Sequence, residues 1–261
     1  MSRLIARAAI VPVMREPSLR SEQMSQLVLG ETARLDASQR EWRRVTTEHD
    51  GYGGWVHAGY VLEVDEDAAL RWRAAANGWS LCAVLRLNGG RLRLPLRART
   101  VVEGDTIGLP DGRRGTLAEG AVPDAGATAR AARAVPPERW ALEHFAGAPY
   151  EWGGVTPWGV DCSGLVQTTF AVREVALPRD SALQVERGAP VAPDALRPGD
   201  LLFFRGEEGP GITHVAFAGD DDTLIHSTVS CGGVLRESWL PGTRAAPLRD
   251  RLVAVRRLED R

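Results

Sequence analysis

Short runs of alternating apolar and polar residues, each ended by a glycine turn, fill the first half of the sequence. The turns are Asp50-Gly51, Gly53-Gly54, Asn88-Gly89-Gly90 and Asp111-Gly112. This spacing is typical of small antiparallel β-barrels, because short strands with a two-residue period must reverse at tight turns. The pattern occurs twice, and both times it ends with a strand, an Asp-Gly turn and a strand. It predicts a divergent tandem repeat of about sixty residues.

The composition changes near residue 130. The segment "VPDAGATARAARAVPPERW" is rich in Ala, Pro and Arg, and it predicts a linker that runs into a helix beginning at Pro137. Downstream, Cys162 to Val175 predicts a helix, "ALRPGDLLFFRG" a turn and a buried strand, and "ITHVAFAGDDDTLIHSTV" a hairpin. Helices precede strands, so we expect an α+β domain with helices packed on an antiparallel sheet. The expected domains are 1–66, 67–130 and 131–261.

Charge and cysteine content exclude several classes of protein. The formal net charge is −2 and the arginines are interspersed with acids, so we expect no nucleic-acid partner. No apolar run is long enough for a membrane span, and we interpret the N-terminus as having no signal peptide. Three widely spaced cysteines form neither a disulfide framework nor a zinc motif. We therefore expect a cytoplasmic protein without metal or cofactor, with a secreted or cell-wall location as the alternative.

Cys162 stands at the start of a predicted helix. An isolated free cysteine is usually a small buried apolar residue. Here Asp161-Cys162-Ser163-Gly164 follows a glycine-rich loop and opens an apolar helical run. Asp161 suits the N-cap, and the positive end of the helix favours a thiolate in the first turn. The context thus predicts a nucleophilic cysteine with a lowered pKa.

The predicted hairpin supplies a base for the thiol. If its turn is centred on Asp220, paired residue numbers sum to about 440, and His214 lies directly opposite His226. One imidazole would then accept the thiol proton while the other orients it. The alternative is a pair of packed or exposed histidines without a role in catalysis.

Six motifs in order resemble the NlpC/P60 family of cysteine peptidases over roughly residues 133 to 260: "PYEWGG", "DCSGLVQ", "LPRDSALQ", "RPGDLLFF", "THVAFAGDDDTLIHS" and "GGV". The resemblance implies a papain-like α+β catalytic domain. It implies that Cys162 is the nucleophile, His214 the general base and His226 the orienting third residue. It also implies that the Tyr150 hydroxyl points toward the oxyanion, with the backbone N–H of Cys162 or of a neighbouring residue as a second donor.

The first half resembles two bacterial SH3-like (SH3b) modules placed before such a domain. This combination is similar to γ-D-glutamyl-L-diamino acid endopeptidases of the dipeptidyl-peptidase VI type, which process murein peptides. The resemblance implies that the first barrel closes one side of the groove and admits peptides with a free N-terminal L-Ala. The substrate-binding residues that it implies are Asp180, Ser181, Ser163, Glu22 and Tyr52.

Such a pocket agrees with simple electrostatics. A primary ammonium in a partly dry groove requires carboxylates, and Asp180 with Glu22 would supply two charge-assisted hydrogen bonds. The alternatives are that Glu22 is a solvated surface acid and Tyr52 a surface aromatic of the barrel. We expect Arg179 to be a rim charge.

The second barrel is expected to be structural. Its arginines at alternate positions are typical of the solvated face of a strand, and Cys82 is expected in the core. Cys231, in a loop after His226, is expected to be an incidental thiol. The alternate arginines are Arg91, Arg93, Arg97 and Arg99.

The sequence thus predicts a cysteine endopeptidase that hydrolyses the γ-D-glutamyl-L-diamino acid bond of murein peptides through a Cys-His-His triad. A non-catalytic muropeptide or cell-wall binding protein is one alternative, and a papain-like amidase or acyltransferase acting on another amide is a second. We expect a monomer. The sequence does not distinguish diaminopimelate from lysine after D-Glu, nor recycling from another physiological role.

Overall fold

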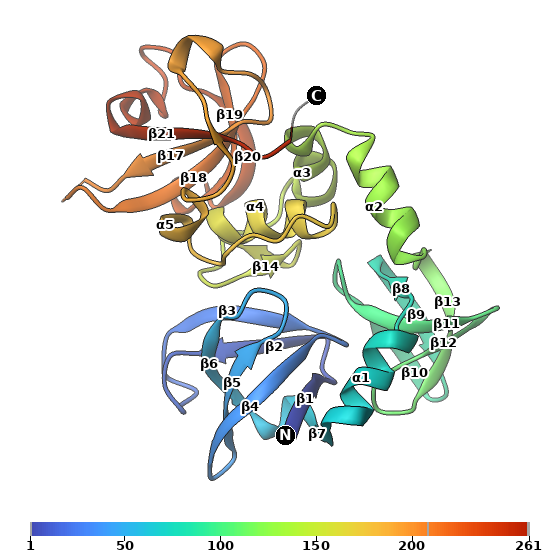
Figure 1. The fold of residues 1–261 in the computed structure, drawn as a ribbon. Coiled ribbons are helices and arrows are strands. Elements are labelled where there is room, and N and C mark those ends of the chain that lie inside the picture. Colours follow the sequence, from blue (N-terminus) through green and yellow to red (C-terminus); the bar gives the residue numbers. More distant parts are fainter. Residues whose placement is uncertain (1, 208, 260–261) are drawn as a thin grey trace. The chain divides into compact units, whose positions relative to one another are not determined.

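A computed structural model describes residues 2–207 and 209–259. The chain divides between Ala129 and Arg130 into two compact units (Figure 1). The N-terminal unit consists mainly of strands, whereas the described part of the C-terminal unit combines helices with a six-stranded sheet and a two-stranded one. None of the helices in the described ranges is both long and apolar enough to cross a membrane.

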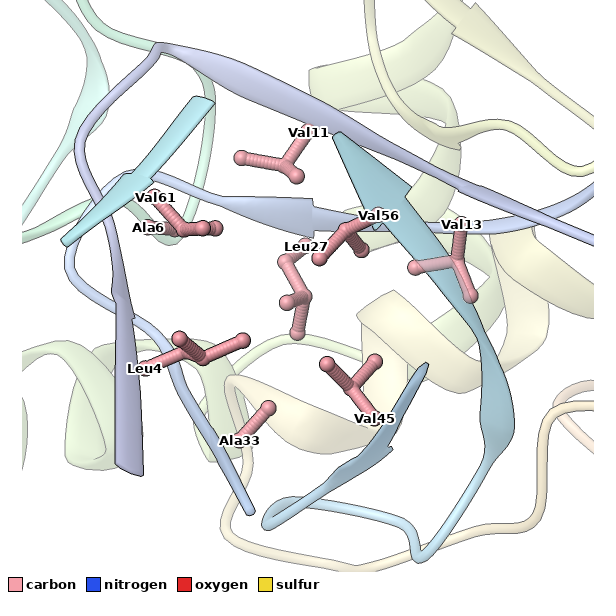
Figure 2. Packing of buried hydrophobic residues seen from close by; sticks show 9 residues of the cluster. All are labelled: Leu4, Ala6, Val11, Val13, Leu27, Ala33, Val45, Val56 and Val61. Carbon is pink, nitrogen blue, oxygen red and sulfur yellow. The ribbon is translucent and has the colours of Figure 1, made fainter. Parts of the chain in front are cut away.

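Residues 2–65 form a seven-stranded antiparallel sheet in the order β3-β2-β6-β5-β4-β1-β7. Its core is made of small apolar residues from most of these strands, whose side chains converge in Figure 2 and are at most 5% exposed. The alternation of the sequence produces this inward face, because successive residues of a strand point to opposite sides. The elements are β1 (Ser2–Ala6), β2 (Ile10–Met14), β3 (Gln23–Val28), β4 (Thr32–Gln39), β5 (Trp42–Thr47), β6 (Gly53–His57), η1 (Ala58–Tyr60) and β7 (Val61–Asp65).

A helix and a second sheet complete the N-terminal unit. Helix α1 (Glu66–Ala75) begins at Asp65, whose carboxylate accepts the Ala68 N–H at 2.6 Å. The sheet over residues 78–121 has six strands in the order β10-β9-β13-β12-β11-β8. They are β8 (Gly78–Trp79), β9 (Leu81–Leu87), β10 (Gly90–Arg93), β11 (Arg99–Glu103), β12 (Thr106–Gly108) and β13 (Arg114–Ala121).

Two expectations for this second sheet are wrong. Arg97 does not lie on a solvated face: it is 3% exposed and its guanidinium lies 3.2 Å from the buried carboxylate of Glu31. A buried arginine is retained because a carboxylate compensates its charge. Cys82 is exposed rather than part of the core.

Two short helices precede the sheet of the C-terminal unit, and the first of them spans the division between Ala129 and Arg130. The segment expected to be a linker contains α2 (Ala125–Arg133), and α3 (Pro137–Phe145) begins at Pro137 as predicted. A short hairpin and two helices follow, and the remaining elements belong to the sheet or flank it. They are β14 (Val155–Thr156), β15 (Gly159–Val160), α4 (Cys162–Ala171), α5 (Ser181–Gln184), β16 (Ala189–Pro190), η2 (Pro193–Ala195), β17 (Leu201–Arg205), β18 (Ile212–Ala218), β19 (Thr223–Thr228), η3 (Val229–Cys231), β20 (Gly233–Ser238), η4 (Ala246–Arg251) and β21 (Leu252–Arg257).

The described part of this unit has an antiparallel sheet in the order β16-β21-β17-β18-β19-β20. Its central strand β17 is apolar throughout Leu201–Phe204, and these four residues are fully buried. One face receives α4, where the rings of Phe170 and Phe217 lie 6.0 Å apart. The other face packs with Trp239 and the segment around η4. The α+β class with helices on an antiparallel sheet is therefore confirmed.

The register of the β18–β19 hairpin differs from the prediction by two residues. Phe217 pairs with Ile225 and Ala218 with Leu224, so paired numbers sum to 442 and the turn is centred on Asp221. His214 is therefore not directly opposite His226 but diagonal to it. Diagonal neighbours have Cβ atoms about 7–8 Å apart, which suits two rings that meet tip to tip.

Candidate active site

Cys162 is the first residue of α4, as the sequence predicts. Asp161 is the N-cap, and its carboxylate accepts the backbone N–H groups of Gly164 at 2.7 Å and Gly153 at 2.8 Å. One carboxylate thus fixes both the start of the helix and the glycine loop before it. A Cβ on Gly164 would overlap the Gly154 carbonyl oxygen, which explains the glycine two residues after the cysteine.

Arg179 is not a rim charge. It is 2% exposed, and its guanidinium binds both carboxylate oxygens of Asp161, at 3.1 and 2.5 Å. It also donates to the Ser163 hydroxyl at 2.8 Å, while that hydroxyl donates to Asp161 at 3.1 Å. The opposite charges of Asp161 and Arg179 therefore compensate each other beneath the start of α4, and their hydrogen-bonding groups have partners there. The hydroxyl of Ser163, a predicted substrate contact, is engaged in this network.

The thiol of Cys162 is enclosed by the protein. Cys162 is 8% exposed, and the backbone N–H groups of Val215 and Ser163 point toward its sulfur. Burial and the Asp161 carboxylate outweigh these donors and Arg179, and they raise the pKa of the thiol to about 12. This direction differs from the lowered pKa that the sequence predicts, because removal from water disfavours the charged thiolate.

His214 and His226 are brought together by strands β18 and β19. Nε2 of His214 lies 2.8 Å from Nδ1 of His226, and the ring centroids are 5.0 Å apart. Burial lowers the pKa of His214 to about 3, and the electrostatic influence of the neighbouring His226 and Arg244 adds to the effect. His214 is thus a neutral imidazole near pH 7, the form that accepts a proton.

Glu237 on β20 extends this arrangement and was not identified from the sequence. Its carboxylate lies 2.7 Å from Nε2 of His226 and also binds the guanidinium of Arg244. In the ladder Glu237 pairs with Leu224, so it shares a face with His226 and is diagonal to it. Alternation in "GVLRES" next to a correctly registered hairpin would have indicated this residue.

Tyr150 lies near the sulfur. Its backbone N–H donates to the Gly232 carbonyl at 2.9 Å, and it bridges to Val160, close to the start of α4. Burial raises the pKa of the Tyr150 hydroxyl to about 12, and electrostatic interactions with Cys162 and Asp161 add to the effect. The hydroxyl therefore keeps its proton across the working pH range and is able to donate a hydrogen bond.

The other predicted substrate contacts lie in both units. Asp180 is the N-cap of α5 and Ser181 its first residue, and Ser181 is 8% exposed. Glu22 precedes β3 and pairs with Arg15 at 2.8 Å. The backbone N–H of Tyr52, which precedes β6, donates to Thr47 Oγ1 at 2.8 Å. The roles of these residues stay predictions.

Comparison with known proteins identifies two domains. Residues 147–246 match the model of the NlpC/P60 family, and residues 13–59 match the bacterial dipeptidyl-peptidase Sh3 domain. The chain also resembles a crystal structure of an NlpC/P60 family protein from Bacillus cereus with a TM-score of 0.77, covering 98% of this chain and 99% of that one. At 20% identity, this likeness concerns the fold.

Two curated relatives carry peptidase names. The gamma-D-glutamyl-L-lysine dipeptidyl-peptidase of Bacillus subtilis is 28% identical over 232 residues, which cover 78% of this chain and 71% of that protein. The probable endopeptidase NlpC of Escherichia coli is 40% identical over 98 residues, or 37% of this chain and 63% of that protein. The match therefore spans less than two thirds of the E. coli relative.

Proposed function

Because the chain carries an NlpC/P60 domain and a dipeptidyl-peptidase SH3 domain, we propose that it is a cysteine peptidase acting on murein peptides. The proposed reaction is hydrolysis of the γ-D-glutamyl-L-diamino acid bond in peptides with a free N-terminal L-Ala. The observation that carries the proposal is the position of Cys162. Its sulfur lies at the start of α4, beside the backbone N–H of Val215. Val215 directly follows His214, whose imidazole is neutral.

Proton transfer to His214 accompanies the attack of the sulfur. The thiol is protonated in the resting chain and the imidazole is neutral, so no ion pair exists before the substrate binds. Nε2 of His214 faces His226, which leaves Nδ1 to accept the thiol proton. As that proton moves, the sulfur bonds to the γ-carbonyl carbon and the carbonyl electron pair moves to oxygen.

The Tyr150 hydroxyl and the backbone N–H of Cys162 stabilise the negative oxygen, because both are donors that keep their protons. When the tetrahedral intermediate collapses, the C–N bond breaks and the amine of the diamino acid takes the proton from His214. Water then attacks the thioester with His214 again as base. The C–S bond then breaks, the sulfur takes back the proton from His214, and the peptide is released with a free γ-carboxyl group on D-Glu.

In this proposal, recognition of the free amine rests on Asp180 and Glu22, with Ser181 and Tyr52 as further contacts. A carboxylate favours an ammonium over an acetylated nitrogen, because the amide loses both the charge and two of its donors. The hydroxyl of Ser163 is already engaged by Asp161 and Arg179, so its proposed contribution is to hold the loop rather than to bind substrate. A cytoplasmic location stays a prediction.

The proposal is tested with L-Ala-γ-D-Glu-meso-diaminopimelate, the corresponding L-Lys peptide and the N-acetylated form of each. We expect cleavage of the free peptides at the γ-D-Glu bond, measured by mass spectrometry, and a loss of at least 100-fold in kcat/KM on acetylation. Equal cleavage of free and acetylated peptides would contradict the amine specificity. The ratio of the two free peptides decides between diaminopimelate and lysine.

Cys162→Ala is expected to abolish turnover while peptide binding is retained, because the nucleophile is removed without altering the pocket. Cys231→Ala, an exposed cysteine in the same unit, is the matched control and should keep full activity. Binding without cleavage by the unaltered chain would favour a non-catalytic muropeptide-binding protein. Transfer of the acyl group to an added amine in preference to water would favour an acyltransferase.

A further inference from the structure

His214, His226 and Glu237 form a diagonal row across strands β18, β19 and β20. The two contacts in the row are 2.8 Å between the imidazoles and 2.7 Å between His226 Nε2 and Glu237 Oε1. His226 is 1% exposed, so solvent does not supply an alternative partner for either of its nitrogens. Its two hydrogen-bonding positions are both used inside the row.

The carboxylate at the end of the row determines the direction of these hydrogen bonds. An ionised carboxylate has acceptors only, so the proton between Glu237 and His226 resides on His226 Nε2. A neutral His226 then offers Nδ1 as an acceptor, and the proton in the next contact resides on His214 Nε2. What remains on His214 is the Nδ1 lone pair, the group that a base must present.

Glu237 is ionised under ordinary conditions. Burial raises its pKa, but the hydrogen bonds and electrostatic interactions with His226 and Arg244 outweigh burial and bring the pKa below its usual value. The Arg244 guanidinium contacts both carboxylate oxygens from the solvent side, and its side chain is 42% exposed. Arg244 thus helps to keep Glu237 ionised, and an ionised Glu237 can only accept hydrogen bonds.

We propose that Glu237 is a positioning residue that, through His226, fixes the tautomer of His214 with the proton on Nε2 and the free lone pair on Nδ1. The inference rests on the proposed function, since it assigns His214 the task of base. It assigns Glu237 a second effect as well. When His214 accepts the thiol proton, the carboxylate stabilises the resulting positive charge across one intervening ring.

The spectroscopic test needs no substrate. We expect imidazole ¹⁵N spectra of the unaltered chain to show His214 and His226 protonated on Nε2, and Glu237→Leu to move a substantial fraction of His214 to the Nδ1-protonated form. Glu237→Gln keeps an acceptor oxygen and should keep the Nε2 tautomers. Arg236→Gln, on the same strand but facing away, is the matched control. An unchanged tautomer in Glu237→Leu would overturn the proposal.

The kinetic test separates positioning from simple charge balance. Glu237→Leu should lower kcat about 100-fold and Glu237→Gln about 10-fold, with KM within about twofold, because orienting partners of this kind contribute 10–100-fold. Thermal unfolding identifies any variant that fails to fold, and the isosteric Gln variant keeps the comparison available.

If Glu237 served only to neutralise Arg244, the double variant Glu237→Gln/Arg244→Gln would recover full kcat. We expect it to remain as slow as Glu237→Gln, and recovery would refute the positioning role. Should the unaltered chain cleave none of the peptides, the proposed function fails. The ¹⁵N spectra would still decide whether Glu237 fixes the tautomer.

Discussion

Two carboxylates adjoin the proposed catalytic groups, each paired with an arginine, yet their surroundings differ. The Asp161–Arg179 pair beside Cys162 is sealed, with side chains 7% and 1% exposed. The Glu237–Arg244 pair beside His226 is open, at 13% and 42%. The Asp161 carboxylate accepts hydrogen bonds from backbone and side-chain donors that hold the start of α4, whereas the Glu237 carboxylate has one oxygen in contact with an imidazole.

The difference indicates that Asp161 has a structural role, whereas Glu237 has a proposed role in the reaction. Asp161 accepts from Gly153, Gly164, Ser163 and Arg179, so its hydrogen-bonding capacity is used to fix where the sulfur lies. Its charge raises the pKa of the thiol, which opposes reactivity at rest. Glu237 is instead proposed to act on the base. In the proposed mechanism, a protonated thiol is held in a fixed place and an oriented imidazole activates it.

The largest expected effect is on stability and distinguishes the two pairs. Arg179→Met should lower the free energy of unfolding by about 3–5 kcal/mol, because it leaves the Asp161 charge buried and uncompensated. Arg244→Met should cost about 0–1 kcal/mol, since that pair is solvated. Urea unfolding followed by tryptophan fluorescence measures both. Equal losses would remove the distinction between a sealed and an open pair.

The next effect concerns the state of the sulfur. With Cys82 and Cys231 changed to Ser so that only Cys162 reacts, the alkylation rate with chloroacetamide should rise about a thousandfold between pH 6 and 9. A thiol with pKa near 12 gains thiolate tenfold per pH unit. A flat rate between pH 5 and 8 would instead reveal a preformed thiolate. Asp161→Asn should raise the rate at each pH, because the carboxylate that disfavours the thiolate is gone.

The same two ends of the site differ in how far the sequence predicts them. The Cys162 end depends on neighbours in sequence: the Asp161 cap and the start of α4 are local features, and both were predicted. The local sequence pattern did not predict the burial of Arg179, because its partner Asp161 lies 18 residues away in the sequence. A charged residue on its own does not reveal whether a distant carboxylate compensates it.

The imidazole end depends on strand register. Three consecutive aspartates, 220 to 222, offer similar turn centres, since Asp tolerates the left-handed region that Asp221 and Asp222 adopt at φ 53°. The prediction centred the turn on Asp220 rather than Asp221, which shifts the pairing of the two strands by two residues. Such a shift keeps every side chain on its face of the sheet but changes its cross-strand neighbours. The shared face of His214 and His226 was therefore predictable, whereas their diagonal contact and the extension to Glu237 were not.

The smallest effect sharpens the comparison at the imidazole end. The folded-state pKa of His214 is about 3, whereas an unfolded histidine titrates near 6.5, so below pH 6.5 the unfolded chain takes up a proton that the folded chain refuses. His214 should therefore reduce the free energy of unfolding by about 1–2 kcal/mol between pH 7 and pH 5. His214→Phe removes this contribution and should show a shallower decline in urea unfolding over that range. His57→Gln, a partly exposed histidine of the N-terminal unit, serves as the control. If the free energy of unfolding declined equally in the unaltered chain and in His214→Phe, His214 would not be held neutral by the fold. The proposed mechanism would then have to start from a protonated imidazole instead of a neutral base.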